Sequence, residues 1–256
     1  MDQPLVLHQT IEPSITLITL NRPEKRNALN IPLLQALQSM LENLRLDHKQ
    51  RVIIVNGAGP VFCAGLDLLE AIHLESENES SSLLAQVLSS IYQMPQITIS
   101  AVHGAALAGG AGLACACDYV VAAKGTRFGF PEVRRGLVAA QVTALLRRQL
   151  GERQLRELIL FGESIEADKA KEMGLINRVV SSEDLMSAAI EAAKIAQKGA
   201  PGAIHQTKIL IEALSTRGIE DDLDIAMEFH HEARHSVEAV EGIKAFMEKR
   251  EPNWNQ

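Results

Sequence analysis

Short β-branched runs and longer segments of helical periodicity alternate along most of the chain. Residues 15–20 (ITLITL) alternate Ile and Thr and stop at an Asn-Arg-Pro turn, which predicts a strand. From Ile31 to Leu46 the apolar residues recur at helical spacing, Asn30 is placed to cap this helix, and Pro32 suits its first turn. The same patterns predict strands at 52–55, 97–102 and 119–123, and helices from about Leu66, at 83–92 and at 110–117. Strands that alternate with helices favour an α/β fold.

Two regions depart from this alternation. Residues 75–82 (ESENESSS) form the most polar stretch and predict a surface loop. From Asp184 onward the pattern is almost entirely helical, with breaks near Pro201 and at 217–218. The first helix of this region has an apolar stripe that must pack against the core or another subunit. The stripe consists of Leu185, Ala188, Ala189, Ala192 and Ile195. We therefore expect an α/β core over residues 1–195 and a helical region over residues 196–256.

Composition narrows the class of protein. The 256 residues are 46% apolar and 22% charged, which excludes a disordered chain and a collagen-like repeat. A chain of this length buries about three quarters of its unfolded surface and needs no metal or disulfide to fold. The net charge of -7 provides no overall positive field, and no local basic patch stands out, so we expect no nucleic-acid partner.

Cysteine content and hydropathy bear on the compartment. Cys63, Cys115 and Cys117 are an odd number, which argues against a disulfide framework and fits a reducing compartment. The N-terminal residues lack a basic start followed by an apolar run, so we expect no signal peptide. The longest uncharged apolar stretch, 105–117, is shorter than the roughly 18 residues that a membrane span needs. We therefore expect a cytoplasmic protein without a membrane partner.

Three short motifs each resemble a known type of chemical site, and each also has a simpler explanation. His231 to His235 (HEARH) match H-E-x-x-H, in which the histidines ligate zinc and Glu232 acts as a base, but a chance match is the alternative and we expect no metal site. Residues 110–115 (GAGLAC) partly resemble a dinucleotide-binding loop without the acidic residue expected about 20 positions further on. Cys63 lies in a turn, yet no histidine is near it in sequence to form the thiolate, so we expect all three cysteines to be buried.

Two glycine-containing loops give a stronger signal together. Residues 62–68 (FCAGLDL) and 103–110 (HGAALAGG) each place small residues between a strand and a helix. Small residues let a ligand reach the backbone, and the first N–H groups of a helix lack internal partners, so two such loops can form an oxyanion hole. Close packing of backbone against a neighbouring helix explains the same residues, and these patterns alone do not separate the two interpretations.

Four segments in order resemble the crotonase, or enoyl-CoA hydratase/isomerase, superfamily. They are 21–29 (NRPEKRNAL), 62–68, 103–110 and 128–132 (FGFPE), and residues 242–254 (GIKAFMEKREPNW) are similar to that family's C-terminal helix. The resemblance covers essentially the whole chain. It implies a spiral of ββα units followed by a C-terminal helical region that builds trimers or hexamers. It also implies an acyl-CoA substrate and no cofactor besides the coenzyme A of that substrate.

The resemblance assigns roles to residues in these segments. The backbone N–H groups of Leu66 and Gly109 would form the oxyanion hole and hold the thioester oxygen as it becomes an enolate. Lys25 and Arg26 would lie near the CoA phosphates, with solvated loop charges as the alternative. The remaining positions that the resemblance places against substrate or CoA are Ala28, Ala64, Asp67, Leu68 and Leu69.

The acid–base group departs from the common family pattern. Two-carboxylate hydratases carry one Glu in the P-E motif, here Glu132, and another three residues after the oxyanion glycine, where this chain has Gly112. One carboxylate can take a proton and return it, so we expect Glu132 to act alone. The expected activity is reversible addition of water to an α,β-unsaturated acyl-CoA. The alternatives are Δ3-Δ2 isomerisation with Glu132 as proton shuttle, and acyl-CoA binding without catalysis.

The stretch after Glu132 suggests an acyl group. Residues 133–148 (VRRGLVAAQVTALLRR) lack the G-G-T-Q-R-L run of short-chain hydratases. They are similar to the E-V-R-x-G-L-x-P-A stretch of the single-glutamate methylglutaconyl-CoA and isohexenylglutaconyl-CoA hydratases. Those enzymes act on branched acyl groups with a free carboxylate, which Arg134 or Arg135 could pair with. Arg134 is the predicted contact, with solvated arginines as the alternative.

Overall fold

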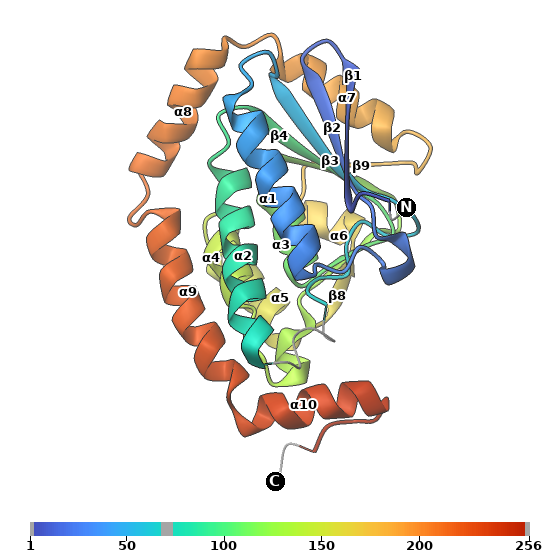
Figure 1. Ribbon diagram of the computed structural model, residues 1–256, viewed down its shortest axis with the longest axis vertical. Coiled ribbons are helices and arrows are strands. Elements are labelled where there is room, and N and C mark those ends of the chain that lie inside the picture. Colours follow the sequence, from blue (N-terminus) through green and yellow to red (C-terminus); the bar gives the residue numbers. More distant parts are fainter. Residues whose placement is uncertain (1–2, 68–73, 254–256) are drawn as a thin grey trace.

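A six-stranded sheet forms the centre of the computed structural model, which describes residues 3–67 and 74–253 (Figure 1). The strand order is β1-β2-β3-β4-β6-β9, with β1 antiparallel to β2 and all other neighbours parallel. The strands are β1 (Val6–Glu12), β2 (Ile15–Leu20), β3 (Val52–Gly57), β4 (Ile97–Val102), β6 (Tyr119–Ala123) and β9 (Arg178–Val180).

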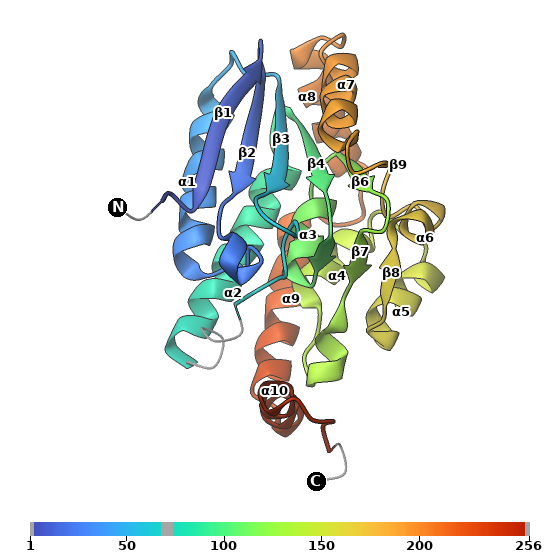
Figure 2. The same ribbon diagram turned by 90° about the vertical axis from the view of Figure 1, so that its right-hand side faces the viewer.

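Both faces of this sheet are apolar, because helices cover both of them. Neighbouring side chains of a strand point to opposite faces. On β3, Ile53 and Val55 belong to the core cluster formed with α1 (Ile31–Leu46) and α2 (Leu74–Tyr92). Val52 and Ile54 belong instead to the cluster formed with α7 (Leu185–Ala196). Figure 2 shows α1 and α2 on one side of the sheet and α7 on the other.

A smaller sheet and several short helices carry the chain away from the first sheet. In the order β5-β7-β8, β5 pairs parallel with β7, and β7 pairs antiparallel with β8. These strands are β5 (Ala105–Leu107), β7 (Arg127–Gly129) and β8 (Ser164–Glu166). The short helices are η1 (Pro23–Lys25), α3 (Gly109–Cys115), η3 (Pro131–Arg135), α4 (Ala140–Leu146), α5 (Glu152–Phe161) and α6 (Ala167–Glu172).

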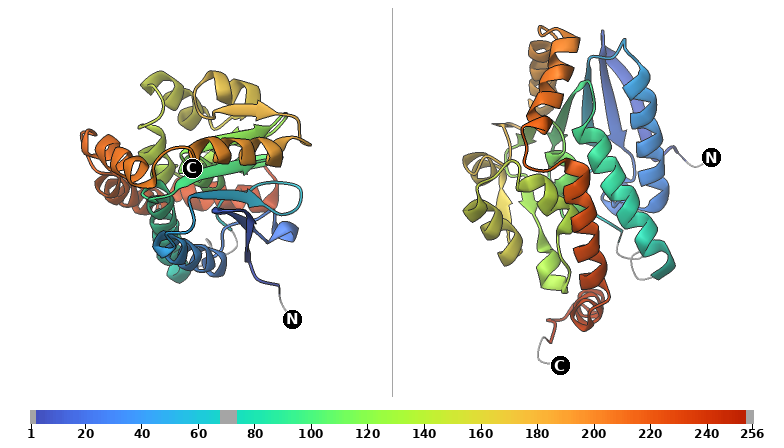
Figure 3. Two further views of the ribbon diagram at one scale, coloured as in Figure 1. Left: turned by 90° about the horizontal axis from the view of Figure 1, so that it is seen from above. Right: turned by 90° about the vertical axis from the view of Figure 1, so that its left-hand side faces the viewer.

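Three helices complete the chain: α8 (Pro201–Ala213), α9 (Ile219–Arg234) and α10 (Val237–Glu248). Helix α9 packs against α2 and α4, and α10 crosses the end of the molecule and packs on η3 (Figure 3). The packing of α9 and α10 thus places them around one region of the fold together with η1, η3, α2 and α4.

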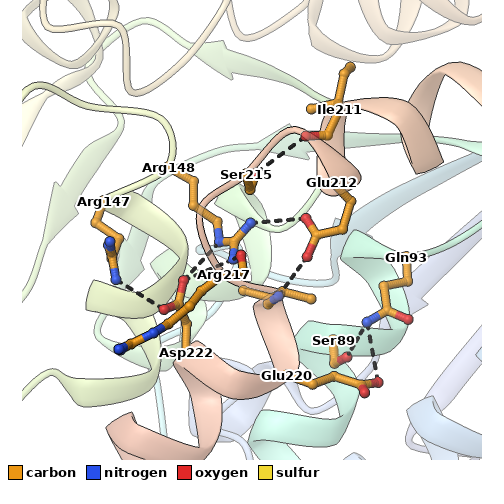
Figure 4. Close-up of polar contacts among 11 residues, drawn as sticks. Ser89, Gln93, Arg147, Arg148, Ile211, Glu212, Ser215, Arg217, Glu220 and Asp222 are labelled. Atoms are coloured by element: carbon orange, nitrogen blue, oxygen red, sulfur yellow. Dashed lines mark hydrogen bonds and ion pairs between the residues drawn. The ribbon is translucent and has the colours of Figure 1, made fainter.

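An ion-pair network fixes the start of α9 on the end of α4 (Figure 4). Asp222, whose side chain is 4% exposed, accepts hydrogen bonds from Arg147 at 3.0 Å and from Arg148 at 2.8 Å. Arg148 also pairs with Glu212 at 2.9 Å. Since buried charges are costly without partners, these contacts hold the α8–α9 turn in one place.

Most strongly periodic segments form the elements that the sequence predicts. The strand 15–20 and the helix 31–46 have the predicted bounds, and the Asn30 side chain accepts a hydrogen bond from the Leu33 N–H at 3.2 Å. The helical region breaks at Pro201 and Gly218 as expected. Of the predicted apolar stripe of α7, Leu185, Ala188 and Ala189 are buried on the sheet and Ala192 is partly buried. Ile195 does not pack there and is 59% exposed. The boundary near 195 falls at the end of α7 and stays a prediction.

The predicted loop at 75–82 is wrong. Helix α2 begins at Leu74, so this segment is helical. Buried Leu84, Val87, Leu88 and Ile91 continue the helical spacing, and this apolar face stabilises the preceding polar turns as helix.

The helix expected from about Leu66 is not formed there, because Leu66 makes a β-bridge with Leu29. Leu68 and Leu69 lie outside the described residues. No helix in the described part of the chain is long and apolar enough to cross a bilayer.

Candidate active site

A cavity of about 560 Å³ opens between η1, α2, η3, α4, α9 and α10. It brings together residues that are far apart in the sequence. The predicted site residues that line it are Lys25, Arg26, Ala28, Ala64, Leu66, Asp67, Gly109 and Glu132. Arg134 is the described site residue that does not line it.

The Leu66 N–H faces the cavity because of how its segment pairs. The Leu29 N–H donates to the Gly65 carbonyl at 2.8 Å, and the Asp67 N–H donates to the Leu29 carbonyl at 3.0 Å. Successive N–H groups of an extended segment point to opposite sides. The Leu66 N–H therefore points away from Leu29, on the side where Leu66 lines the cavity.

Gly109 supplies a second backbone N–H at the same place. It is the first residue of α3, where a helix N–H has no partner within the helix. The preceding Ala108 has φ 51 and ψ -129, a conformation that costs a non-glycine residue on the order of 1–3 kcal/mol. Its own N–H is held by the Gly129 carbonyl at 2.8 Å, which directs the chain into α3.

Gly65 allows these two donor segments to meet. Its φ is +92, and a Cβ there would lie 2.9 Å from the Leu107 carbonyl oxygen and 3.5 Å from the Gly109 nitrogen. A side chain would therefore separate the segments. Leu66 and Gly109 therefore line one cavity side by side, as the expected oxyanion hole requires.

Asn27 connects the segment 21–29 to residues 58–62, a role that is not apparent from the sequence. Its side chain is fully buried and its Nδ2 donates to the carbonyls of Ala58, Val61 and Phe62 at 2.8 to 3.0 Å. Its Oδ1 accepts from the Arg22 N–H at 2.9 Å. An asparagine in a positively charged loop looks like an ordinary turn residue in the sequence, so only its burial reveals this function.

Arg22 and Asp67 form a second link, which joins the segment 21–29 to the segment that carries Leu66. Their ion pair is 2.6 Å long, and both side chains are largely buried. Arg22 also donates to the Ala28 carbonyl at 3.0 Å. Lys25 and Arg26 follow on η1 and at its end, where they line the cavity.

Glu132 is the acidic side chain of η3, and it lines the same cavity as Leu66 and Gly109. Its Oε2 is buried, and no described residue donates a hydrogen bond to it. Burial raises the pKa of the Glu132 carboxyl to about 7, and its own backbone N–H and the charge of Arg135 oppose this only in part. A carboxyl with a pKa near neutrality can both accept and donate a proton.

Gly112 lies in α3 where a second carboxylate would stand in two-carboxylate relatives. A Cβ at this position would lie 2.9 Å from Val142 Cγ2 and 3.7 Å from Leu88 Cδ2. The space is therefore filled by apolar side chains of α4 and α2, and among the described residues that line the cavity no second carboxylate takes this position.

The two arginines after Glu132 point in different directions. Arg134 is bonded to the Phe161 carbonyl at 3.2 Å and forms an ion pair with Glu163 away from the cavity. Arg135 lines the cavity, and its guanidinium lies 4.4 Å from the centre of the Phe246 ring. The structure thus does not bring the predicted Arg134 to the cavity and brings Arg135 there, since consecutive side chains of a 3-10 helix are turned from each other by about 120°.

Comparison with known proteins agrees with this geometry. The sequence profile described as enoyl-CoA hydratase/isomerase matches residues 10–256. A Thermus thermophilus protein provisionally named enoyl-CoA hydratase is 36% identical over 245 residues, which cover 94% of this chain and 97% of that protein. The chain belongs to the enoyl-CoA hydratase/isomerase family.

Other members of the enoyl-CoA hydratase/isomerase family match over nearly their full length. The mevalonyl-coenzyme A hydratase sidH of Aspergillus fumigatus is 33% identical over 247 residues, covering 94% of this chain and 92% of that protein. The structure of a carnitinyl-CoA dehydratase from Mycobacterium avium superposes with a TM-score of 0.85 at 33% identity, covering 99% of each chain. The family resemblance and the α/β crotonase-like fold predicted from the sequence are confirmed.

The competing motifs find no support in this family member. Cys63, Cys115 and Cys117 are all buried as predicted, and burial raises the pKa of Cys63 and of Cys115 to about 12. The rings of His231 and His235 lie 4.4 Å apart, but within residues 3–67 and 74–253 no group of three or more His, Cys, Asp or Glu side chains is placed to hold a metal ion.

The sequence does not indicate the polar side chains that α2, α4 and α9 contribute to the cavity. They are Ser80 and Ser81 of α2, Gln141 of α4, and His230 and Arg234 of α9. Ser80 and Ser81 lie in the stretch that was predicted as a surface loop, and the other three lie in segments whose sequence is typical of ordinary helices. Only the packing of α9 against α2 and α4 brings them to one cavity.

Proposed function

We propose that this protein adds water reversibly to an α,β-unsaturated acyl-CoA. The observation that carries the proposal is the buried Glu132 carboxyl, with a pKa of about 7, in one cavity with the backbone donors of Leu66 and Gly109. The hydratase and dehydratase names of the relatives support the same chemistry.

In the proposed reaction, the Glu132 carboxylate takes a proton from water as the water oxygen bonds to the β carbon. Electrons move from the double bond to the thioester oxygen, which becomes an enolate held by the Leu66 and Gly109 N–H groups. The protonated Glu132 then gives its proton to the α carbon as the thioester re-forms. One water is added, and Glu132 returns to its starting state.

Double-bond isomerisation is the second candidate, and the apolar surroundings of Gly112 favour it. Val142 and Leu88 occupy the position of a second acid that could help to hold water. In this reaction Glu132 takes a proton from the α carbon of a 3-enoyl-CoA and returns it to the γ carbon. The same two backbone donors hold the enolate.

Absorbance separates these reactions. Hydration removes the absorbance of the conjugated enone from a 2-enoyl-CoA, whereas isomerisation raises it from a 3-enoyl-CoA. We expect Glu132→Gln to lower turnover by about 10²–10⁴-fold, because general acid–base catalysis typically supplies that much. Acyl-CoA binding should change little, since the oxyanion donors are backbone groups. A folded Glu132→Gln protein with near wild-type turnover contradicts the mechanism, and binding without turnover of either substrate by the wild type identifies a non-catalytic acyl-CoA-binding protein.

Coenzyme A is proposed to enter as part of the substrate, with no separate cofactor. Lys25 and Arg26 lie at the edge of the cavity, where their charges suit CoA phosphates. Ala28, Ala64 and Asp67 line the same side and leave room for the thioester arm. For a branched or carboxylated acyl group, Arg135 lines the cavity and Arg134 does not.

A homo-oligomer, a trimer or a hexamer, is proposed from the exposed apolar side chains of the C-terminal helices. On α8, Ile211 is 58% exposed and Leu214, which follows the helix, is 77% exposed. On α9, Phe229 is 58% exposed. Patches of this kind mark protein interfaces.

The three buried, unpaired cysteines fit a reducing compartment, and we propose a cytoplasmic location.

A further inference from the structure

The wall of the cavity formed by α2, α4 and α9 carries polar side chains beside Leu84 and Val142, although an ordinary acyl chain is a hydrocarbon. Ser81 is 1% exposed and Gln141 is 4% exposed, yet both line the cavity together with His230. Burial of such groups is costly unless they are hydrogen-bonded. The hydrogen bonds that these side chains make, and those that they can still offer, therefore indicate what the cavity holds.

Ser81 and His230 form a pair that joins α2 to α9. The Ser81 Oγ lies 2.8 Å from the His230 Nε2. Burial, with the charges of Arg234 and the neighbouring histidines, lowers the pKa of His230 to about 4, so its imidazole is neutral at neutral pH. A neutral imidazole and a hydroxyl share one hydrogen in this contact. Whichever group donates it, the serine keeps either its O–H or its lone pairs for a ligand.

Gln141 extends this polar surface. Its Nε2 donates to the Met227 sulfur at 3.1 Å, and a thioether is a weak acceptor. The amide has a second N–H and a carbonyl oxygen to offer. Met227 precedes His230 by three residues on α9, so Gln141 and the Ser81–His230 pair are neighbours along one face of that helix.

The position of this surface relative to the reacting bond follows from α2. Leu84 packs on the oxyanion donor, since its Cδ2 lies 2.9 Å from where a Gly109 Cβ would be. Ser81 is three residues earlier, about one helical turn or 5 Å along α2. About one turn of α2 therefore separates the polar side chains from the donor of the thioester oxygen, which leaves a more distant part of the acyl group as their neighbour in the proposed complex.

We infer that Ser81, Gln141 and His230 form a specificity subsite for an acyl group that carries an oxygen substituent beyond the reacting double bond. The inference rests on the proposed acyl-CoA chemistry of this cavity. A hydroxyl fits both hydrogen arrangements of the Ser81–His230 pair, because it donates as well as accepts. A carboxylate fits only the arrangement in which His230 donates to Ser81 and the serine O–H points to the ligand. Arg234 lines the same cavity.

Three 2-enoyl-CoA esters of equal length test this inference: one that ends in methyl, one in hydroxyl and one in carboxylate. We expect kcat/KM of the wild type to be at least about tenfold higher for an oxygen-bearing ester than for the methyl ester, because a site built to hydrogen-bond rejects an analogue without the polar group. Whichever of the hydroxyl and carboxylate esters is faster identifies the substituent.

Ser81→Ala and His230→Leu should each remove most of this preference by lowering kcat/KM for the oxygen-bearing ester while the methyl ester is unchanged or improved. Ser82→Ala and His231→Leu are matched controls, because these neighbours do not line the cavity, and they should keep the wild-type preference. A wild type that prefers the methyl ester, or variants that lower all three esters equally, would overturn the inference.

Binding of the corresponding saturated acyl-CoA esters, measured by titration calorimetry, separates this inference from the proposed reaction. Tighter binding of an oxygen-bearing ester, lost in Ser81→Ala, supports the subsite even if no ester is hydrated. Hydration of all three 2-enoyl esters without any preference in binding or turnover supports the reaction and refutes the subsite.

Discussion

At the scale of single residues, the environment of Glu132 governs how the protein should respond to pH. Its carboxyl has lost water contact without gaining a hydrogen bond at Oε2, which explains the raised pKa. Two consequences follow, one for activity and one for stability, and they have opposite signs.

The activity should fall on the acid side of neutrality. Glu132 must be ionised to take a proton from water, so kcat/KM for hydration should decrease about tenfold per pH unit below a pH of about 7. A pH–rate profile measured with a slow substrate checks this. An acid limb near the ordinary glutamate value of 4.5 would contradict the raised pKa of Glu132.

The stability should change in the other direction. The folded-state pKa of Glu132 is above its unfolded value, so the stabilisation is present at low pH and is lost as pH rises through about 7. Glu132→Gln removes this loss. We expect the variant to have a higher Tm than the wild type at about pH 8 and a similar Tm at about pH 4. Equal differences at both pH values would contradict the assignment.

Gly112 offers a test of packing beside this carboxyl. Gly112→Glu should destabilise the fold by about 1–3 kcal/mol, since the new side chain meets Val142 Cγ2 at 2.9 Å from its Cβ. Val142→Ala removes that methyl, so the double variant should be more stable than the sum of the two single changes predicts. A double-mutant cycle from denaturant unfolding measures this coupling, and strict additivity would rule out the contact.

The sequence identified Glu132, Leu66 and Gly109 as candidates because the family motifs contain them. It gave no indication of Asn27 as a buried anchor, and it favoured Arg134 over Arg135. Which face of a five-residue 3-10 helix turns inward depends on α10, which lies far along the chain. Side-chain direction at that level is decided by tertiary packing.

At the scale of elements, α10 is the support of η3. A Cβ on Gly242 would lie 2.3 Å from the Arg135 carbonyl carbon and oxygen, and one on Gly136 would lie 2.3 Å from the Glu238 carbonyl atoms. The two backbones are therefore in direct contact through two glycines. The 3-10 helix that carries Glu132 is held by the C-terminal helix.

Gly242→Ala should displace η3 and lower kcat by about 10²-fold, because small misplacements of a catalytic group have effects of that size. The variant should keep its circular dichroism spectrum, as the sheet and α1 do not contact this position. Gly202→Ala on α8 is the matched control, since nothing lies within 4 Å of a Cβ there, and its kcat should be unchanged. Wild-type kcat in Gly242→Ala would show that α10 does not position Glu132.

Long periodic elements were predictable, and short ones were not. Most apolar residues of helix α1 and strand β2 are buried, as their repeats predict, although Leu46 at the end of α1 is 74% exposed. Strands β5, β7 and β8 have three residues each, too few for a periodic pattern, and exist because neighbouring segments complete their hydrogen bonds. The polar start of α2 was misassigned for the related reason that its support comes from the rest of the helix.

At the scale of the whole molecule, the proposed oligomer is open to direct measurement. The mass in solution should be three or six times 27.9 kDa at micromolar concentration. We expect charge on the exposed apolar side chains of α8, introduced as Ile211→Glu with Leu214→Glu, to shift the protein toward the monomer mass. Light scattering coupled to size exclusion gives both values. A wild type with the mass of one chain would refute the oligomer.

The seating of α10 on η3 also bears on how activity arises during protein synthesis. The loops of Leu66 and Gly109 and all strands of the sheet leave the ribosome before α10 does. A growing chain can therefore assemble the segments that are proposed to hold the thioester while η3, which carries Glu132, is still unsupported. In the proposed mechanism proton transfer requires α10 on η3, so we expect a chain that ends before α10 to sequester acyl-CoA without converting it.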